Sequence, residues 1–355
     1  MAGIDLQRTN TNRLDKVTDA EYTLAQTFPL SGKNLSRGRA AEAEALGAYE
    51  ELRRAELDLV NRLQGAYYRL AGSYGQLEIT RRNQQLLKDL SEISRRKNEV
   101  GAAMQSDVLI AQTELARLTE KVAMIEQDIF EQQTNINVLM NRPAEAPLAQ
   151  PAALEFTPSR LRLEEAHAIA AKLRPEILMA IRQTEANQAR LQLAHRQWIP
   201  DPQLQVKARQ FSGALGIQEY DTGIFVSIPW SNPRKYSAGV EEAASNLAGS
   251  QYQLEAAHAE IAGMVHHQLK KIETFAANYQ LFHDQILPTA QLAVKSTRAG
   301  YETDKNTFLE LITAQRSMQE IESSALNQLT EHQVAIAELE AIVGSTPFLS
   351  TPQHP

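Results

Sequence analysis

The chain has 355 residues, 43% of them apolar and only 6% aromatic, with no cysteine and a formal net charge of −7. The negative and interspersed charge argues against a nucleic-acid partner, and the lack of cysteine excludes disulfides, thiolate metal sites and cysteine nucleophiles. No run of about 18 apolar residues is present, which excludes a transmembrane helix, and no signal peptide opens the chain at Met1.

Residues 1–35 are expected to hold a first pair of strands. Apolar Tyr22, Leu24 and Phe28 alternate with polar residues, which is the period of a strand with two different faces. Strands of roughly nine or ten residues are long enough to cross a bilayer when they are tilted. The alternation alone equally allows a pair of soluble hairpins.

Residues 36–142 are predicted to form a long helical hairpin. No proline occurs from Ser36 to Asn98, and apolar residues recur at spacings of three and four, so a helix of about 60 residues and about 90 Å is expected. A turn at Val100 and Gly101 follows. The second helix carries a heptad repeat, which predicts a coiled-coil pair, at Val108, Leu115, Val122, Ile129 and Ile136.

The second half of the chain repeats this order. Prolines predict an irregular linker within 143–174, and a helix at 175–199 leads into a second strand pair at 200–232. A second long helical hairpin is expected at 233–344, bent at Pro288, with a C-terminal tail at 345–355. The apolar residues that alternate in the second strand pair are Leu204, Val206, Ile224, Val226, Ile228 and Trp230.

The two halves match at a spacing of 200 residues. The matching pairs are Pro29 and Pro229, Ser31 and Ser231, Glu42 and Glu242, and Ala43 and Ala243. At this spacing the counterpart of the helix at 175–199 falls before Met1. The sequence is therefore expected to lack one helix of the first repeat together with an export signal. Four strands are too few to close a barrel, which needs about eight, so the chain is expected to pool its strands with further copies of itself.

The order of these elements resembles the TolC-like outer-membrane efflux family. The matching stretches are "AYYRLAGSYGQLE" in the first long helix, "VGAAMQSDVLIAQTEL" at the first turn, "RPEILMAIRQTEANQARLQLAHRQWIPDPQL" before the second strand pair, and "AGYETDKNTFLELITAQRSM" at the second turn. The stretches "SIPWSNPRK" and "ILPTAQLAVKSTRAGYETDKNTFLELITAQ" look most like the heavy-metal (CzcC-type) and related branch of that family.

The resemblance implies a mainly α fold with a small β part. Long antiparallel coiled-coil hairpins would form a periplasmic tunnel, and four strands per chain would contribute to a trimeric 12-stranded transmembrane β-barrel. The implied function is a passive exit channel for drugs or metal ions in the outer membrane of a Gram-negative bacterium. The implied partners are two further copies, a periplasmic adaptor protein, an inner-membrane pump and outer-membrane lipid, with no nucleic acid and no cofactor.

The resemblance also assigns roles to single positions. The two helical turns would dock the adaptor, through Val100, Gly101, Ala102, Ala299, Gly300 and Tyr301. Glu310 matches an acidic residue of the family's closed entrance, where Thr313 stands in place of a second acid. Four extra residues separate Gly300 from the following Ala-Gln pair, so the two tips are expected to differ by about one helical turn. The residues expected to face lipid are Tyr22, Leu24, Phe28, Leu204, Val206, Ile224, Val226, Ile228 and Trp230.

No catalytic pattern appears in the sequence, so an enzyme is not expected. The adjacent His266 and His267 would point about 100° apart on a helix, which does not suit a shared metal ion. Two alternatives to the efflux channel stay open. A type I secretion channel shares the architecture, and a soluble coiled-coil scaffold would account for the helices but needs neither the strands nor the duplication.

Overall fold

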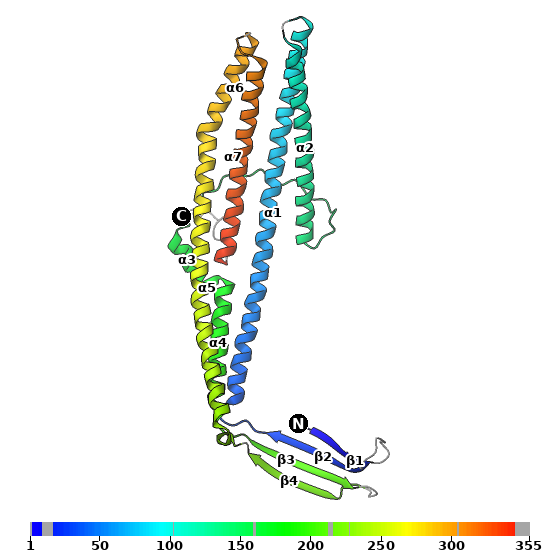
Figure 1. Cartoon of the computed structure of the whole chain (residues 1–355), viewed down its shortest axis with the longest axis vertical. Coiled ribbons are helices and arrows are strands. Elements are labelled where there is room, and N and C mark those ends of the chain that lie inside the picture. Colours follow the sequence, from blue (N-terminus) through cyan, green and yellow to red (C-terminus); the bar gives the residue numbers. More distant parts are fainter. Residues whose placement is uncertain are drawn as a thin grey trace. The chain divides into compact units, whose positions relative to one another are not determined.

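The computed structural model describes residues 2–8, 17–101, 103–158, 161–211, 216–226, 228–303 and 305–344 (Figure 1). The elements in chain order are β1 (Ala2–Arg8), β2 (Val17–Thr27), α1 (Lys33–Glu99), α2 (Gln105–Leu139), α3 (Leu163–Leu173), α4 (Pro175–Arg196), β3 (Pro202–Phe211), β4 (Glu219–Val226), a 3-10 turn (Pro229–Ser231), α5 (Pro233–Leu281), a π-helical turn (Phe282–Ile286), α6 (Leu287–Glu302) and α7 (Phe308–Val343). The predicted fold class, mainly helical with a small β part, is confirmed.

The chain divides into two compact units. The first contains Met1–Glu51 and Glu176–Ala257, and the second contains Leu52–Pro175 and His258–Pro355. Each unit therefore combines segments from both halves of the sequence. Among the described helices, none has both the length and the apolar character that a membrane crossing needs.

The first unit contains an antiparallel sheet with the strand order β1-β2-β3-β4. Each strand pairs with its neighbours in sequence order, so β2 of the first repeat lies beside β3 of the second (Figure 1). The register places Leu24 opposite Val206, and Val206 opposite Thr222. Strands β1 and β4 are the two edges of this sheet.

Three residues expected in strands lie just beyond them. Phe28 follows the end of β2, although its backbone N–H still donates to the Pro202 carbonyl at 2.9 Å. Ile228 and Trp230 follow β4, and Trp230 belongs to the 3-10 turn. The prediction was wrong because Pro29 and Pro229 have no N–H to donate and so end the sheet pairing at equivalent points of the two repeats.

A buried lysine fixes the junctions between the sheet and the helices. The Lys33 side chain is only 2% exposed, and its Nζ donates to the Ile199 carbonyl at 2.6 Å and to Asp201 Oδ2 at 2.8 Å. Asp201 Oδ1 accepts from the backbone N–H of Leu30 at 3.2 Å. The entry into α1 is thereby joined to the segment between α4 and β3.

The second unit contains two helical hairpins, α1 with α2 and α6 with α7 (Figure 1). One buried cluster joins α1 to α2, with Ala66, Leu70, Leu77, Ile129 and Ile136. A second cluster, near the turns, joins both hairpins, with Leu87, Leu90, Ala111, Tyr301, Phe308, Leu311 and Ile312. The heptad residues Ile129 and Ile136 thus pack where the sequence predicted a coiled pair.

The second long helix changes its hydrogen-bond pattern where a bend was expected. The π-helical turn Phe282–Ile286 comes directly before Leu287 and Pro288. Because proline has no N–H, the helical ladder loses a bond at Pro288, and the wider π-helical turn precedes that gap.

Glycine is required where α7 ends. Gly344 has φ +78°, and a Cβ at this position would lie 2.7 Å from the carbonyl oxygen of Leu173. The Arg174 Nη1 atom donates to the Ala341 carbonyl at 2.5 Å. The end of α7 is thus held tightly against the junction between α3 and α4.

Candidate functional site

The sheet has one apolar and one polar face. Because paired residues in neighbouring strands share a face, the register groups Tyr22 with Ala208 and Tyr220, and Leu24 with Val206 and Thr222. This face is open in the single chain, since the side chain of Leu24 is 62% exposed and that of Ile224 is 75% exposed. Large apolar side chains left in the open mark a surface that something else covers.

The opposite face carries charged side chains that pair across the strands. Glu21 accepts from Lys207 and from Arg209, each at 2.8 Å, and Arg209 lies 3.6 Å from Glu219. Phe225 is the apolar exception, because the register places it opposite Gln203 on this polar face. The two faces therefore suit two different environments.

The turn between α1 and α2 exposes apolar side chains. Val100 is 78% exposed and Met104 is 74% exposed. Gly101 has φ +74° and ends α1 in the left-handed conformation, which glycine adopts without strain. Asn98 Nδ2 donates to the Ala103 carbonyl at 2.9 Å and so closes the turn. Ala102, also expected at this tip, lies outside the described residues.

Gly300 has a different structural role from Gly101. It lies inside α6, and its carbonyl accepts from the backbone N–H groups of Lys305 at 2.8 Å and Asn306 at 3.2 Å. A Cβ on Gly300 would lie 2.2 Å from Asn306 Oδ1. The residue is therefore needed for close packing of the turn rather than as the cap that ends the helix.

The extra residues of the second hairpin belong to α6. The connections between the helices, residues 100–104 and 303–307, are equally long. Helix α1 ends before Gly101, whereas α6 continues beyond Gly300 to Glu302. Alignment of the two glycines in the sequence therefore does not pair equivalent points of the two turns.

Tyr301 is not available to a docking partner. Its side chain is buried, its ring centroid lies 5.5 Å from that of Phe308, and Lys97 Nζ lies 4.6 Å from the ring centroid. The expected surface role is wrong for this ring because the tyrosine fills the cluster between the hairpins. Ala299, by contrast, is exposed.

Glu310 takes part in a capping box at the start of α7. Its Oε2 accepts from the Thr307 backbone N–H at 2.8 Å, and its own N–H donates to Thr307 Oγ1 at 3.2 Å. Thr313 is exposed, and its hydroxyl donates to the Leu309 carbonyl at 2.7 Å. The sequence contains a local signal for this role, because Thr307 followed three residues later by Glu310 is the pattern of a capping box.

Polar contacts tie the two hairpins together along α1, α2 and α7. Gln315 Nε2 donates to Asn83 Oδ1 at 2.6 Å, and Arg82 pairs with Glu322 at 2.7 Å. Arg316 pairs with Glu114 at 2.5 Å, and Glu114 is largely buried. Any separation of the hairpins near their turns must break these contacts.

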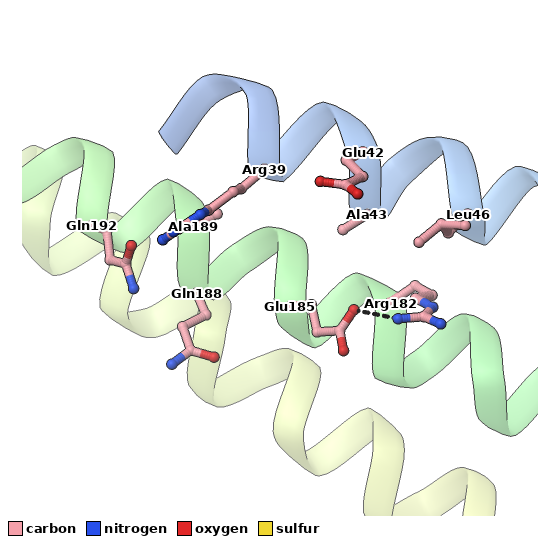
Figure 2. A pocket seen from close by; sticks show the side chains of 9 residues that line it. All are labelled: Arg39, Glu42, Ala43, Leu46, Arg182, Glu185, Gln188, Ala189 and Gln192. Carbon is pink, nitrogen blue, oxygen red and sulfur yellow. Dashed lines mark hydrogen bonds and ion pairs between the residues drawn. The ribbon is translucent and has the colours of Figure 1, made fainter. Parts of the chain in front are cut away.

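In the first unit, α1 and α4 enclose an open groove of about 430 Å³ (Figure 2). Arg182 and Glu185, both on α4, point toward one another and pair at 2.9 Å. This hydrogen bond raises the pKa of Arg182. Glu42 of α1 reaches into the groove from the other side. The arrangement is a paired, solvated surface without a nucleophile.

The described residues contain no group of three or more histidine, aspartate or glutamate side chains that could hold a metal ion. His266 and His267 are both exposed on α5.

Comparisons with known proteins show which proteins this chain resembles. Residues 3–142 match the family model described as outer membrane efflux protein. No curated protein matches the chain. Among solved structures, the chain is similar to the outer-membrane channel OprN, with a TM-score of 0.81 at 18% identity over 98% of this chain and 80% of that one.

Two further solved structures have the same fold. The outer membrane protein VceC from Vibrio cholerae matches with a TM-score of 0.81 at 17% identity, over 97% of this chain and 86% of that one. The MtrE outer membrane channel of Neisseria gonorrhoeae matches with a TM-score of 0.77 at 17% identity, over 97% and 79%. The chain thus has the fold of an outer-membrane channel. Its resemblance to the TolC-like outer membrane efflux protein family is confirmed.

Proposed function

We propose that the chain is one subunit of a trimeric outer-membrane exit duct, through which an efflux system releases small solutes from the periplasm. The observation that carries this proposal is the two-faced sheet. Its apolar face, with Leu24 and Ile224 open to the surroundings, suits lipid. Its polar face, with Glu21 paired to Lys207 and Arg209, suits a water-filled lumen.

The open edges of the sheet support assembly from several copies. Among the described residues, strands β1 and β4 each pair with a neighbour on one side only. A sheet edge in lipid leaves N–H and C=O groups without partners, which a closed barrel avoids. Pairing of β4 in one copy with β1 in the next gives a ring, and three copies supply about twelve strands, within the range of outer-membrane barrels.

The partners of this duct belong to the same proposal. The exposed apolar Val100 and Met104 at the first turn suit contact with a periplasmic adaptor protein, and the adaptor would link the duct to an inner-membrane pump. In this proposal the duct itself is passive, and the energy for transport comes from the pump. The resemblance of two stretches to the heavy-metal (CzcC-type) branch extends the proposal to metal ions as transported solutes.

The entrance is proposed to lie near the second turn, at Glu310. Three symmetry-related carboxylates around an axis would favour cations over anions. The capping box holds each carboxylate at the start of α7, which limits how far it can swing. Thr313, at the position of the family's second acid, would leave the ring with a single layer of charge.

The test is to produce the chain with a bacterial export signal in a Gram-negative host that lacks its own channel of this kind. The proposal predicts a trimer in the outer-membrane fraction, a conducting pore in planar bilayers, and increased resistance to toxic small solutes when the cognate adaptor and pump are co-expressed. A protein that stays soluble without detergent and forms no conducting pore would favour the scaffold alternative. Export of a polypeptide with no effect on small solutes would favour the secretion channel.

A further inference from the structure

The polar face of the sheet carries an aromatic ring that the alternation along β4 does not explain. The register places Phe225 of β4 opposite Gln203 of β3, and Gln203 opposite Thr27 of β2, so these three positions share the polar face. The side chain of Phe225 is 52% exposed. A single exposed apolar side chain is ordinary on a protein surface, so the surroundings of this ring decide whether it has a use.

A glycine leaves the space beside the ring open. Gly223 lies two residues before Phe225 on the same face of β4, and a Cβ there would lie 3.0 Å from the ring atom Cε2 and 3.4 Å from Cζ. The ring therefore lies over Gly223, along the strand. Because the side chain is half exposed, the ring stays open to a solute on the side that points away from the sheet.

The charges of the polar face are confined to its other end. The charged residues among its described side chains are Glu21, Lys207, Arg209, Glu219 and Asp221. Phe225 lies at the end where β4 leads toward α5, beside the uncharged Gln203. The other ring on this face, Phe211, is the last residue of β3 and lies at the charged end. Phe225 thus combines an open ring with uncharged surroundings.

The charged end has an excess of negative charge. Its described side chains are three carboxylates and two cationic groups. Glu21 accepts from Lys207 and from Arg209, each at 2.8 Å, and Arg209 also lies 3.6 Å from Glu219. The two cationic groups are therefore engaged by carboxylates of the sheet itself. In a water-filled lumen, an excess of carboxylates raises the local concentration of cations.

We propose that Phe225 is a contact site for planar aromatic cations that pass along the polar face of the sheet. The face of a phenyl ring attracts both flat aromatic systems and cations. The charged end supplies the preference for positive charge, and the open ring supplies the preference for a flat, apolar body. This inference rests on the proposed channel, in which the polar face lines the lumen.

Three copies would bring three such rings to one level of the lumen. Twelve strands about 4.8 Å apart and tilted by about 40° close into a barrel with a diameter of about 24 Å between backbones. Side chains narrow this opening further, so a solute of drug size passes close to a ring. The 200-residue spacing pairs Phe225 with Ala25, so the first repeat supplies no ring at the corresponding position.

Block of single channels by a planar aromatic cation tests the proposal. The probe is ethidium, and tetraethylammonium is the matched cation without an aromatic ring. In planar bilayers, Phe225→Ala is expected to raise the ethidium concentration for half-block by about five-fold, and that of tetraethylammonium by less than about two-fold. Phe225→Leu, which keeps an apolar side chain without an aromatic face, is expected to behave like Phe225→Ala.

Two further variants separate the ring from its surroundings. Gly223→Ala keeps the phenyl ring but places a methyl group 3.0 Å from its Cε2 atom, so the ring must shift, and ethidium block is expected to weaken. Thr222→Ala, on the opposite face of the same strand, is expected to leave ethidium block unchanged.

The outcomes distinguish this site from the channel itself. Unchanged ethidium block in Phe225→Ala, in channels that conduct normally, would overturn the contact site and leave the proposed channel standing. Equal weakening of both blockers would show that the ring only narrows the pore, and would overturn the contact site as well. A parent protein that forms no pore would contradict the proposed function, and this inference with it.

Discussion

Thr307 and Glu310 bind each other reciprocally at the start of α7, each backbone N–H donating to the other side chain. Glutamine keeps an acceptor at this position, so Glu310→Gln is expected to change the free energy of unfolding by less than about 0.5 kcal/mol. Thr307→Ala removes the N-cap acceptor and is expected to cost about 1 kcal/mol. Denaturant titration of the solubilised protein measures both.

The same Glu310→Gln variant tests the proposed entrance. Loss of the carboxylate is expected to weaken cation selectivity and divalent-cation block in single-channel recordings, because three negative charges leave the axis. Thr307→Ala serves as the control, since it loosens the helix start but keeps the charge. If Glu310→Gln conducts with unchanged selectivity and block, the constriction lies elsewhere and Glu310 acts only in the capping box.

Gly300→Ala and Gly263→Ala are expected to have effects of opposite sign. A Cβ on Gly300 meets Asn306 Oδ1 at 2.2 Å, so the asparagine must leave its place and the second turn loosens. Gly263 is also helical, and a Cβ there meets nothing within 4 Å, so alanine stabilises by about 0.5 to 1 kcal/mol. Faster hydrogen exchange over residues 300–308 would report the loosened turn. Return to the parent's exchange rate in the double variant Gly300→Ala with Asn306→Ala would identify the clash as the cause.

Lys33→Met is expected to destabilise the first unit strongly. Asp201 would keep its bond from the Leu30 N–H but lose a buried cation 2.8 Å away, at a cost of about 3 kcal/mol. The control is Arg62→Met, which breaks the exposed pair of Arg62 with Asp58 and is expected to cost less than about 0.5 kcal/mol. Equal losses for the two variants in thermal unfolding would show that burial of Lys33 adds nothing.

The helices were predictable because their signals are local and periodic. The spacing of apolar residues located the long helices, and the paired prolines marked where each strand pair meets a helix. The Lys33 to Asp201 contact was not predictable, since its partners are 168 residues apart and neither position carries a pattern. The burial of Tyr301 was missed for a related reason: a tyrosine beside a glycine at a helical turn gives no sign of which neighbour it packs against.

The burial of His332 in α7 was equally invisible in the sequence. Its ring packs against Phe156 from the linker, and Phe156 in turn stacks on Tyr279 of α5, so these contacts join segments that are far apart in the sequence. Alternation did predict the two faces of the sheet, because strand geometry forces adjacent side chains to opposite sides. It wrongly extended the strands to Phe28, Ile228 and Trp230, because the alternation of apolar residues continues past the point where the prolines end the strands.

Stability is expected to fall with rising pH because of Glu340. Burial raises the pKa of this carboxyl group above its ordinary value of 4.5, while the Gln64 amide, donating at 3.4 Å, opposes the shift. The folded state therefore holds the proton more tightly than the unfolded state. The contribution is present below the ordinary value and is lost as pH rises through the raised native pKa.

Glu340→Gln removes this dependence. The variant is expected to be more stable than the parent at pH 7. It is expected to show no gain well below pH 4.5, where Glu340 of the parent is protonated in both the folded and the unfolded state. Urea unfolding at a series of pH values measures the difference. An identical slope of stability against pH in parent and variant would show that Glu340 does not titrate between these limits.

The most direct test of the central claim compares two neighbouring residues of β3 that lie on opposite faces of the sheet. Val206 is flanked by Leu24 and Thr222 on the apolar face, and Gln205 by Ala25 and Gly223 on the polar face. If the apolar face meets lipid, Val206→Arg should cost roughly 2 to 4 kcal/mol near mid-bilayer and abolish assembly of trimers in the outer membrane, while Gln205→Arg should assemble and conduct. Equal assembly of the two variants would contradict a membrane-spanning role for this sheet.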